Sequence, residues 1–195
     1  MAILVTGGAR SGKSSFAESY AAHLGKRGIY IATSPVFDDE LESRVRLHRQ
    51  RRDQSSFSWE TIEEQFALDS LLQKLGEREE VAQKETVVLV DCLTLWLSNW
   101  LLRLEYSSGE AGVLQQIDAL QEAIRRFPGS LLLVTNEVGY GIVPEHALGR
   151  MFRDLAGILN QRTAKACEQV FLVTAGIPLE IKSRAFHMER NNNPT

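Results

Sequence analysis

A glycine-rich segment near the start of the chain has the residue types of a phosphate-binding loop. It follows the pattern G-x-x-x-x-G-K-[ST] and consists of Gly7, Gly8, Ala9, Arg10, Ser11, Gly12, Lys13 and Ser14. The glycines let successive backbone N–H groups turn toward phosphate oxygens, the lysine reaches the β- and γ-phosphates, and the serine hydroxyl is a ligand for Mg²⁺. An apolar run precedes the loop and a segment with helical spacing follows it, so the sequence predicts phosphates at a helix N-terminus rather than an ordinary glycine-rich turn.

A carboxylate, Asp91, ends the nearly continuous apolar run at residues 86–91. Such a run is typical of a central parallel strand that is covered on both faces. In P-loop proteins a carboxylate at this place supports Mg²⁺ beside the phosphates, so Asp91 and Ser14 are the candidate metal ligands. Alternatively, Asp91 caps the helix that we expect to begin near Leu93, and the two roles can coexist.

A basic segment gathers five arginines around His48. Acidic residues at positions 38–40 suit the start of a helix that extends through Arg52, and on such a helix positions 44, 48, 51 and 52 share one face. Guanidinium groups on both sides of an imidazole suit a polyphosphate. From the charge pattern alone, a solvated basic helix with an incidental histidine is the favoured alternative.

A further polar pair, Asn136 and Glu137, follows the buried strand expected at residues 130–135. Ligands of open parallel sheets lie outside the carboxyl ends of the strands, which places this pair near whatever Lys13 holds. A polar turn without chemistry is about equally compatible with the sequence.

The remaining pattern predicts the elements that position these residues. Apolar runs at residues 2–6, 29–33, 86–91, 130–135 and 169–174 alternate with helical stretches, which predicts an α/β P-loop (RecA-like) nucleotide-binding fold with a mainly parallel sheet covered by helices. We expect a helical stretch through about Leu75, an exposed connection at residues 76–85, and a helix over residues 113–127. A later helix is expected to hold Pro144 in its first turn and to leave the following residues mainly off its apolar stripe: Arg150, Arg153, Asn160 and Arg162.

Size and composition bound the class of protein. A chain of 195 residues with 44% hydrophobic residues suits one domain, residues 1–186, with a flexible tail at residues 187–195. The formal net charge of −3 argues against a general nucleic-acid or anionic-membrane binder. The two cysteines lie in apolar surroundings and not in a C-x-x-C pair, which argues against a disulfide framework or a zinc site and favours a reducing, cytoplasmic location. Neither a secretory signal nor a membrane span is expected.

Segments along nearly the whole chain resemble one family, the bifunctional adenosylcobinamide kinase/adenosylcobinamide-phosphate guanylyltransferases of cobalamin biosynthesis. The resemblance begins with the phosphate-binding loop, Tyr30-Ile31-Ala32-Thr33-Ser34 and the basic segment around His48. It continues with Asp91-Cys92-Leu93-Thr94-Leu95-Trp96-Leu97-Ser98-Asn99, Thr135-Asn136-Glu137-Val138-Gly139, Gly141-Ile142-Val143-Pro144-Glu145, Arg153-Asp154-Leu155-Ala156-Gly157 and Ala175-Gly176-Ile177-Pro178.

This resemblance implies two reactions at one site. ATP or GTP phosphorylates the aminopropanol hydroxyl of adenosylcobinamide, and GMP is then transferred from GTP through a guanylylated histidine, whose position is matched by His48. The nucleotide site would also include Ala32, Thr33, Ser34, Arg49, Gln50, Arg51, Arg52, Glu63 and Asp91, with Mg²⁺ as cofactor. The resemblance further implies a homotrimer.

Two questions of function stay open at the level of sequence. We hypothesise that Glu137 is the base of the kinase reaction, because it leaves a strand end beside the phosphate-binding loop. The first rival function is a P-loop kinase for another small hydroxyl substrate, in which His48 is a bystander. The second is a nucleotide-dependent switch or motor, against which the acidic net charge argues.

Overall fold

The computed structural model describes residues 1–34, 52 and 55–186. The candidate residues His48, Arg49, Gln50 and Arg51, most of the helix expected at residues 38–52, and the tail at residues 187–195 lie outside the described residues.

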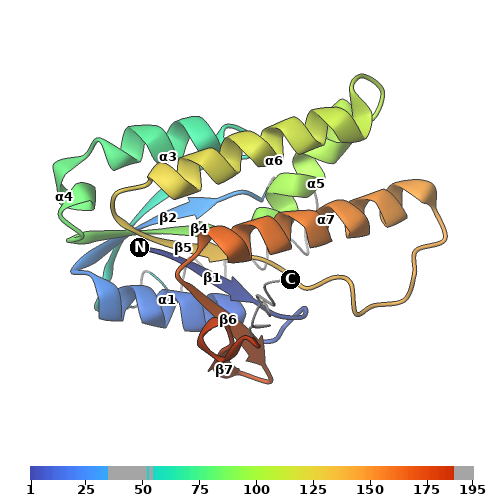
Figure 1. Ribbon diagram of the computed structural model, residues 1–195. Coiled ribbons are helices and arrows are strands. Elements are labelled where there is room, and N and C mark those ends of the chain that lie inside the picture. The colour runs from blue at the N-terminus through green and yellow to red at the C-terminus, as the bar shows by residue number, and fades with distance from the viewer. Residues whose placement is uncertain (35–51, 53–54, 187–195) are drawn as a thin grey trace, which may run out of the picture.

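A seven-stranded sheet forms the centre of the molecule (Figure 1). Its strands stand in the order β3-β2-β4-β5-β1-β6-β7 and have these bounds: β1 (Ala2–Thr6), β2 (Arg27–Ala32), β3 (Ser58–Glu63), β4 (Thr86–Asp91), β5 (Ser130–Val134), β6 (Gln169–Thr174) and β7 (Ile177–Glu180). Neighbouring strands pair in parallel, except that β6 and β7 form an antiparallel hairpin. The predicted α/β fold with a mainly parallel sheet is therefore confirmed.

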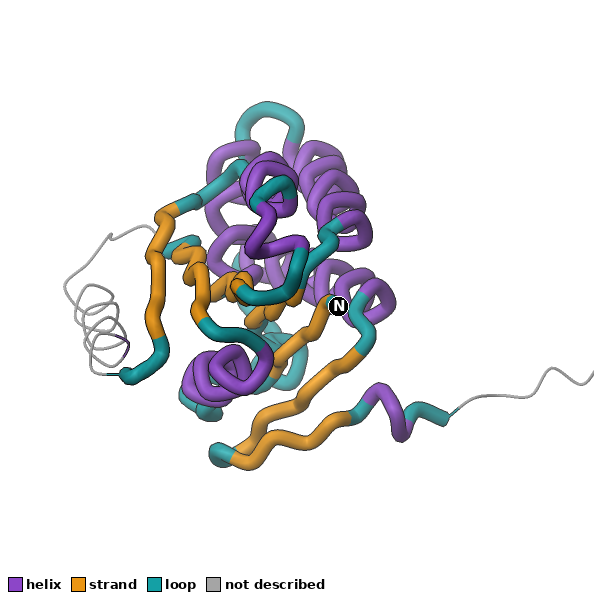
Figure 2. The backbone as a smooth tube through the Cα atoms, turned by 90° about the vertical axis from the view of Figure 1, so that its left-hand side faces the viewer, coloured by secondary structure: helices purple, strands orange, loops and turns teal. Residues whose placement is uncertain are grey.

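Helices cover both faces of this sheet (Figures 1 and 2). On one face lies α1 (Lys13–Leu24), and on the other lie α3 (Leu68–Gly76), α5 (Leu93–Leu104), α6 (Gly109–Arg126) and α7 (Ala147–Ala166). Two short helices, α4 (Glu79–Ala82) and the 3₁₀ helix η1 (Lys182–Arg184), complete the described elements. Across these described ranges, no helix joins the length and the apolar character that crossing a bilayer requires.

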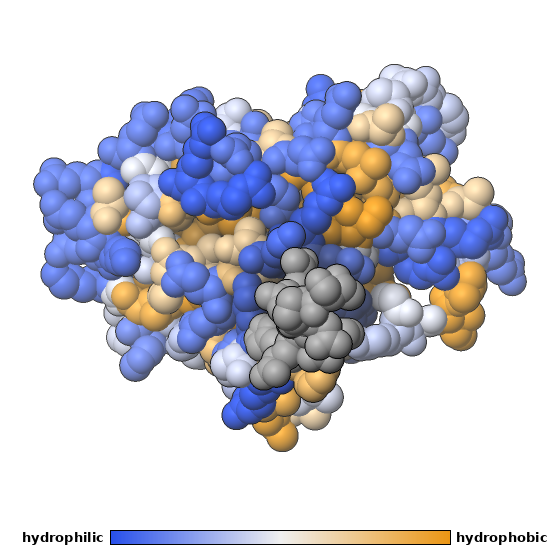
Figure 3. All heavy atoms as spheres, viewed as in Figure 1, coloured by the Kyte–Doolittle hydropathy of each residue, from blue (hydrophilic) through white to orange (hydrophobic). Residues whose placement is uncertain are grey.

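Large apolar side chains are exposed at several places in the described chain, including Tyr106 after α5 and Phe186. Two of these places are the loop between β5 and α7, where Ile142 is 97% exposed and Tyr140 is 88% exposed, and β7, where Ile177 is exposed. Figure 3 shows apolar atoms at the surface at the β6–β7 hairpin.

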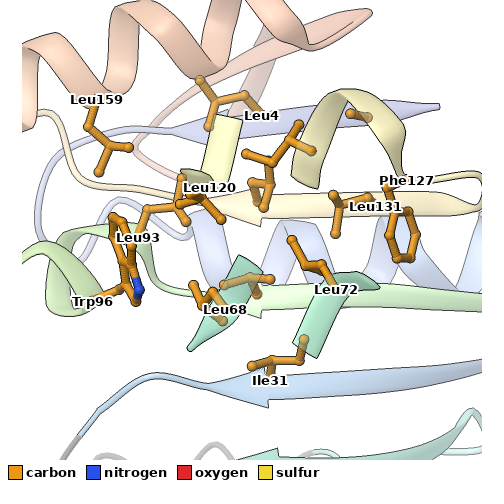
Figure 4. Close-up of a cluster of buried hydrophobic side chains, with 14 of the residues drawn as sticks. Leu4, Ile31, Leu68, Leu72, Leu93, Trp96, Leu120, Phe127, Leu131 and Leu159 are labelled. Carbon is orange, nitrogen blue, oxygen red and sulfur yellow. The ribbon is translucent and has the colours of Figure 1, made fainter. Parts of the chain in front are cut away.

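The alternation of side chains along each strand divides the core into two clusters. In β1, Leu4 joins the larger cluster beneath α3, α5, α6 and α7, while Ile3 and Val5 join the smaller cluster beneath α1. Figure 4 shows the larger cluster, in which Trp96 and Leu120 project from helices toward the strands. Because both faces are buried, the central strands read as continuous apolar runs, which is why the sequence located them.

One strand was not predicted from the sequence, and two sequence expectations about the elements are wrong. Residues 58–63 form β3 at the edge of the sheet, a strand that the half-exposed, charged sequence does not indicate. The region from 76 to 85 holds α4, whose Val81 is fully buried, so it is not simply an exposed connection. The last long helix begins at Ala147, after His146 as its N-cap residue, so Pro144 lies in the preceding loop and not in the first turn.

Candidate functional site

The phosphate-binding loop connects β1 to α1 in the way that the motif requires. The backbone of Arg10 and Gly12 lies in the left-handed region, with φ of 57° and 95°, and the Lys13 ammonium donates to the Gly8 carbonyl oxygen at 3.1 Å. Among the described residues no side chain caps the start of α1, and the first turn of this helix holds no acidic residue. The positive end of the helix dipole therefore faces the loop, as an anion site needs.

Two glycines in this loop are required by close contacts. A Cβ atom on Gly7 would lie 2.4 Å from the Val173 carbonyl oxygen, and one on Gly12 would lie 3.1 Å from the Gly176 Cα atom. The Gly176 amide also donates to the Ser11 carbonyl oxygen at 2.8 Å. The turn between β6 and β7 thus braces the phosphate-binding loop from outside.

The carboxyl ends of three adjacent strands align in one row beside the loop. In the strand register Glu63 lies opposite Ala32, and Ala32 lies opposite Asp91. The α1 helix packs against β4, so Ser14 and Asp91 lie on neighbouring elements. Burial raises the pKa of Cys92, the Asp91 carboxylate raises it further, and the Lys13 ammonium lowers it, in keeping with an acidic strand end near the loop.

Buried hydrogen bonds of Thr33 connect the carboxyl ends of β2 and β4. Its hydroxyl donates to the Cys92 carbonyl oxygen at 2.7 Å and accepts from the Cys92 amide at 2.8 Å, and its own carbonyl oxygen accepts from the Asn99 side chain at 3.0 Å. Thr33 and Asn99 are both buried. Thr33 therefore holds β2 against the start of α5, and its hydroxyl is already used within the protein.

A buried cluster surrounds Asp91. The Tyr30 hydroxyl donates to Asp91 Oδ2 at 3.1 Å, and the Arg52 guanidinium lies over the Tyr30 ring with 3.6 Å between Cζ and the ring centroid. The Arg52 side chain is only 4% exposed and pairs with Glu18 of α1 at 3.4 Å. Burial, and next the Asp91 carboxylate, raise the pKa of Tyr30 well above its ordinary value, so the hydroxyl stays protonated and serves as the donor.

Asp91 does not cap α5. The residue before this helix is Cys92, and no side chain caps it. The Tyr30 hydroxyl instead holds one oxygen of the Asp91 carboxylate. The capping alternative is thus excluded, and the carboxylate lies at the strand end where a phosphate-bound cation would need it.

A second buried network positions Asn136 and Glu137. The Thr94 hydroxyl accepts from the Asn136 amide at 2.7 Å, and the Asn160 side chain donates to the Asn136 carbonyl oxygen at 3.0 Å. The Glu137 amide donates to the Gly7 carbonyl oxygen at 3.0 Å. The prediction that this pair lies beside the phosphate-binding loop is confirmed. Asn160, which the sequence places off the apolar stripe of its helix, is nevertheless buried in this network.

Neither cysteine is suited to thiolate chemistry. Burial raises the pKa of Cys92 to about 12 and the pKa of Cys167 to about 12. Both thiols are therefore neutral near pH 7, so neither is activated as a nucleophile.

The oxygen donors of Ser14 and Asp91 fit a hard divalent cation that is held mainly by a nucleotide. A cation of this kind takes one or two protein oxygens and fills its remaining positions with phosphate oxygens and water. Within residues 1–34, 52 and 55–186, no group of three or more His, Cys, Asp and Glu side chains gathers as a separate metal site. The Ser11 hydroxyl oxygen in the loop is buried and has no partner among the described residues, which also fits a site completed by a ligand.

A cavity of about 440 Å³ lies elsewhere, between α3 and α6, where Leu72, Ala123 and Phe127 line it. Phe127 precedes β5, so the cavity is near the amino end of that strand and far from the carboxyl edge that holds Asp91. It plays no part in the site.

Sequence reasoning located the loop, Asp91, Asn136 and Glu137, but it did not assign the side chains that hold them. Tyr30, Thr94 and Asn160 became visible only through their contacts. The sequence did draw attention to Tyr30 and Thr94, because both lie in segments on which the family resemblance rests. Asn160 gave none.

Comparisons with known proteins identify the family of the chain. The family model described as "Cobinamide kinase / cobinamide phosphate guanyltransferase" matches residues 3–181. The bifunctional adenosylcobalamin biosynthesis protein CobU of Escherichia coli is 41% identical over 191 residues, which are 93% of this chain and 100% of the relative. Protein CobP of Pseudomonas aeruginosa, with the same description, is 43% identical over 184 residues, which are 92% of this chain and 96% of the relative. The chain therefore belongs to the cobinamide kinase/cobinamide phosphate guanyltransferase family.

Proposed function

We propose that this protein phosphorylates the aminopropanol hydroxyl of adenosylcobinamide and then transfers GMP from GTP to the new phosphate, giving adenosylcobinamide-GDP. One observation carries the proposal. The phosphate-binding loop, Asp91 and the Asn136–Glu137 turn meet at the carboxyl edge of the sheet in a chain whose family is defined by these two reactions. A kinase for another small hydroxyl substrate would share the loop but would have no use for GMP transfer.

In the kinase reaction the chain binds the triphosphate through the loop amides and Lys13. Bound Mg²⁺, held by Ser14 and Asp91, would neutralise charge on the β- and γ-phosphates. Glu137 is the proposed base that accepts the proton of the substrate hydroxyl. Its backbone amide is fixed on Gly7, and its carboxylate has no hydrogen bond or ion pair with the described part of the chain. Replacement by glutamine should therefore lower phosphorylation at least tenfold; unchanged phosphorylation in Glu137→Gln would remove Glu137 from this role.

In the guanylyl transfer the proposed nucleophile is His48. A neutral imidazole nitrogen attacks the α-phosphorus of GTP, a P–N bond forms, and the bond to the leaving pyrophosphate breaks. The phosphate of adenosylcobinamide phosphate then takes the guanylyl group from the histidine. Arg49, Gln50, Arg51 and Arg52 are proposed to contact GTP or GMP, and Glu63 at the end of β3 to take part in nucleotide recognition. The register of Glu63 with Ala32 at the same edge supports the last assignment.

A direct product assay tests the proposal. The protein is incubated with adenosylcobinamide, Mg²⁺ and either ATP or GTP, and mass spectrometry follows the corrinoid phosphate and its GDP derivative. Both should form with GTP, and Lys13→Ala should lose both if one triphosphate site serves the two reactions. Lys26→Ala is the matched control, because Lys26 is 80% exposed and pairs with Glu85 away from the loop. Formation of the phosphate alone would support the simple kinase, and formation of neither would refute the proposal.

We also propose that the protein is a homo-oligomer, a trimer by family resemblance. The exposed apolar side chains of the β5–α7 loop and of β7 support an oligomer, because surfaces of this kind are usually covered. Light scattering coupled to size exclusion should give three times the chain mass of 21.9 kDa; a monomer at micromolar concentration would contradict it.

A further inference from the structure

Tyr30 makes polar contact with two groups that the proposed function needs. From β2 its hydroxyl donates to Asp91 Oδ2 at 3.1 Å, while its ring face carries the Arg52 guanidinium at 3.6 Å. The ring is buried, with 6% of the residue exposed, and its edge meets Trp59 at a centroid distance of 6.1 Å. One side chain is thus in contact with a carboxylate at its tip and with a cation on its face.

The carboxylate is constrained on one side only. Asp91 Oδ2 accepts the Tyr30 hydrogen bond, whereas Oδ1 accepts none from residues 1–34, 52 and 55–186. A hydrogen bond to one carboxylate oxygen fixes the rotation of the group and so directs the other oxygen. Tyr30 therefore sets the direction in which Asp91 can offer a ligand oxygen.

The Arg52 guanidinium is held by contacts on two sides. The Arg52 guanidinium lies between the Tyr30 ring and Glu18, and its Nη1 is 3.4 Å from Glu18 Oε1. Glu18 lies on α1 one turn beyond Ser14. The end of the basic segment is thus attached to the same helix that begins at the phosphate-binding loop, with the Tyr30 ring as its other support.

We propose that Tyr30 is a positioning residue that serves both reactions: its hydroxyl orients Asp91 toward the nucleotide-bound cation, and its ring holds Arg52 for GTP. The proposal rests on the proposed function, since it takes Asp91 and Arg52 in the roles given above. A residue that only filled space in the core would contribute through its ring and not through its hydroxyl. The two contributions can be separated because different substitutions remove them.

The first test separates the hydroxyl from the ring. Tyr30→Phe removes the hydrogen bond to Asp91 and keeps the ring beneath Arg52. Manganese binding in the presence of a non-hydrolysable GTP analogue, measured by electron paramagnetic resonance, should weaken roughly tenfold, as is usual when the partner of a metal ligand is removed. The affinity of Tyr30→Phe for the same analogue in EDTA should stay within about twofold of the wild-type value, because metal-free binding of the analogue depends on the loop and on Arg52.

The matched control is Tyr20→Phe. Tyr20 also donates its hydroxyl to a side-chain oxygen at 3.1 Å, that of Gln169, and touches none of Asp91, Arg52 and Glu18 in the described contacts. Manganese affinity should be unchanged in this variant. Equal manganese affinity in Tyr30→Phe and wild type, or equal losses in Tyr30→Phe and Tyr20→Phe, would overturn the assignment of the hydroxyl.

The second test addresses the ring. Tyr30→Leu removes both contacts, so it should weaken manganese binding as Tyr30→Phe does and should in addition weaken analogue binding in EDTA at least fivefold. Glu18→Gln removes the ionic partner of Arg52 and should weaken only analogue binding, which keeps the test available if Tyr30→Leu does not fold. Unchanged analogue affinity in both variants would overturn the role of the ring.

These binding measurements need no turnover. A wild-type protein that binds the analogue and manganese but makes no corrinoid product would refute the proposed function, and the manganese comparison would still decide whether Tyr30 orients Asp91. Normal product formation with no difference between wild type and the Tyr30 variants would refute only the role of Tyr30.

Discussion

Replacing Thr94 by valine should remove a hydrogen bond that holds the Asn136–Glu137 turn against α5. The Thr94 hydroxyl accepts from the Asn136 amide at 2.7 Å and lies 3.2 Å from Thr135 Oγ1. Thr135 gives its one hydroxyl hydrogen to Asn160 Oδ1 at 2.7 Å, so Thr94 must be the donor in the threonine pair. Valine keeps the shape of the side chain and removes both hydrogen bonds.

The loss of stability in Thr94→Val follows mainly from the Asn136 amide, which is left without a hydrogen-bond acceptor. Thr94 is only 6% exposed, so water cannot readily replace the lost hydroxyl. An orphaned, largely buried amide costs about 1–3 kcal/mol, and the lost bond to Thr135 adds about 1 kcal/mol. We therefore expect Thr94→Val to lower the free energy of unfolding by about 2–4 kcal/mol. For a chain of this size the melting temperature should fall by about 4–16 °C.

Urea unfolding followed by circular dichroism measures this loss. The midpoint should fall while the m-value stays constant, because the substitution changes stability and not the surface exposed on unfolding. Thr94→Ser is the control, since it keeps the hydroxyl and loses one methyl group; it should retain most of the stability. A free energy of unfolding for Thr94→Val within about 0.5 kcal/mol of wild type, or an equal loss in Thr94→Ser, would refute the reasoning.

Three further predictions concern the loop, acid stability and the thiols. Gly7→Ala should lower the melting temperature markedly, because its Cβ would meet a carbonyl oxygen at 2.4 Å. Gly8→Ala should not, since none of the described residues lies within 4 Å of its Cβ, and equal melting temperatures would contradict this. Hydrogen bonds from the hydroxyl and the amide of Ser183 lower the pKa of Glu180 to about 2. The stabilising contribution of this carboxylate is therefore present above pH 4.5 and is lost as the pH falls toward 2. The urea midpoints of Glu180→Gln should depend less on pH in that window than those of wild type. Because burial raises the pKa of Cys92 and Cys167 to about 12, a disulfide reagent at pH 8 should modify them only as fast as the protein opens, and rapid modification of the native protein would count against their burial.

The sequence predicted those parts of the fold that follow from burial on both faces. Strands such as β4 and β5 are buried from end to end, so their apolar runs marked them clearly. The edge strand β3 (Ser58–Glu63) is mostly exposed, with only Trp59 and Ile62 partly buried, and has no such run. Its position depends on pairing with β2, which is a long-range contact that local composition does not encode.

Some residues of the candidate site could be predicted from the sequence and others could not. The loop motif and the carboxylate Asp91 could be predicted because their chemistry demands particular residue types at particular places. Asn160 could not, since an amide on a helix has the same local pattern whether it faces water or a buried network. Helical spacing placed it off the apolar stripe, and only the contacts with Thr135 and Asn136 show that it faces inward.

Tyr30 is the more instructive case. As part of β2 it looks like an ordinary core aromatic, and its apolar neighbours reinforce that interpretation. Its hydroxyl reaches Asp91 because β2 and β4 are adjacent and in register, which depends on the strand order of the whole sheet. Sequence can name the residues that meet a ligand, but the residues that hold them become apparent only once the strands are in place.

The most direct test of the proposed function is covalent labelling with GTP. The protein is incubated with GTP labelled at the α-phosphorus, denatured, and divided between acid and alkali. We predict one label per chain that is lost in acid, survives alkali and is absent from His48→Ala, as expected for guanylylated histidine. Failure to label the denatured protein, or labelling that persists in His48→Ala, would contradict the proposed guanylyl transfer.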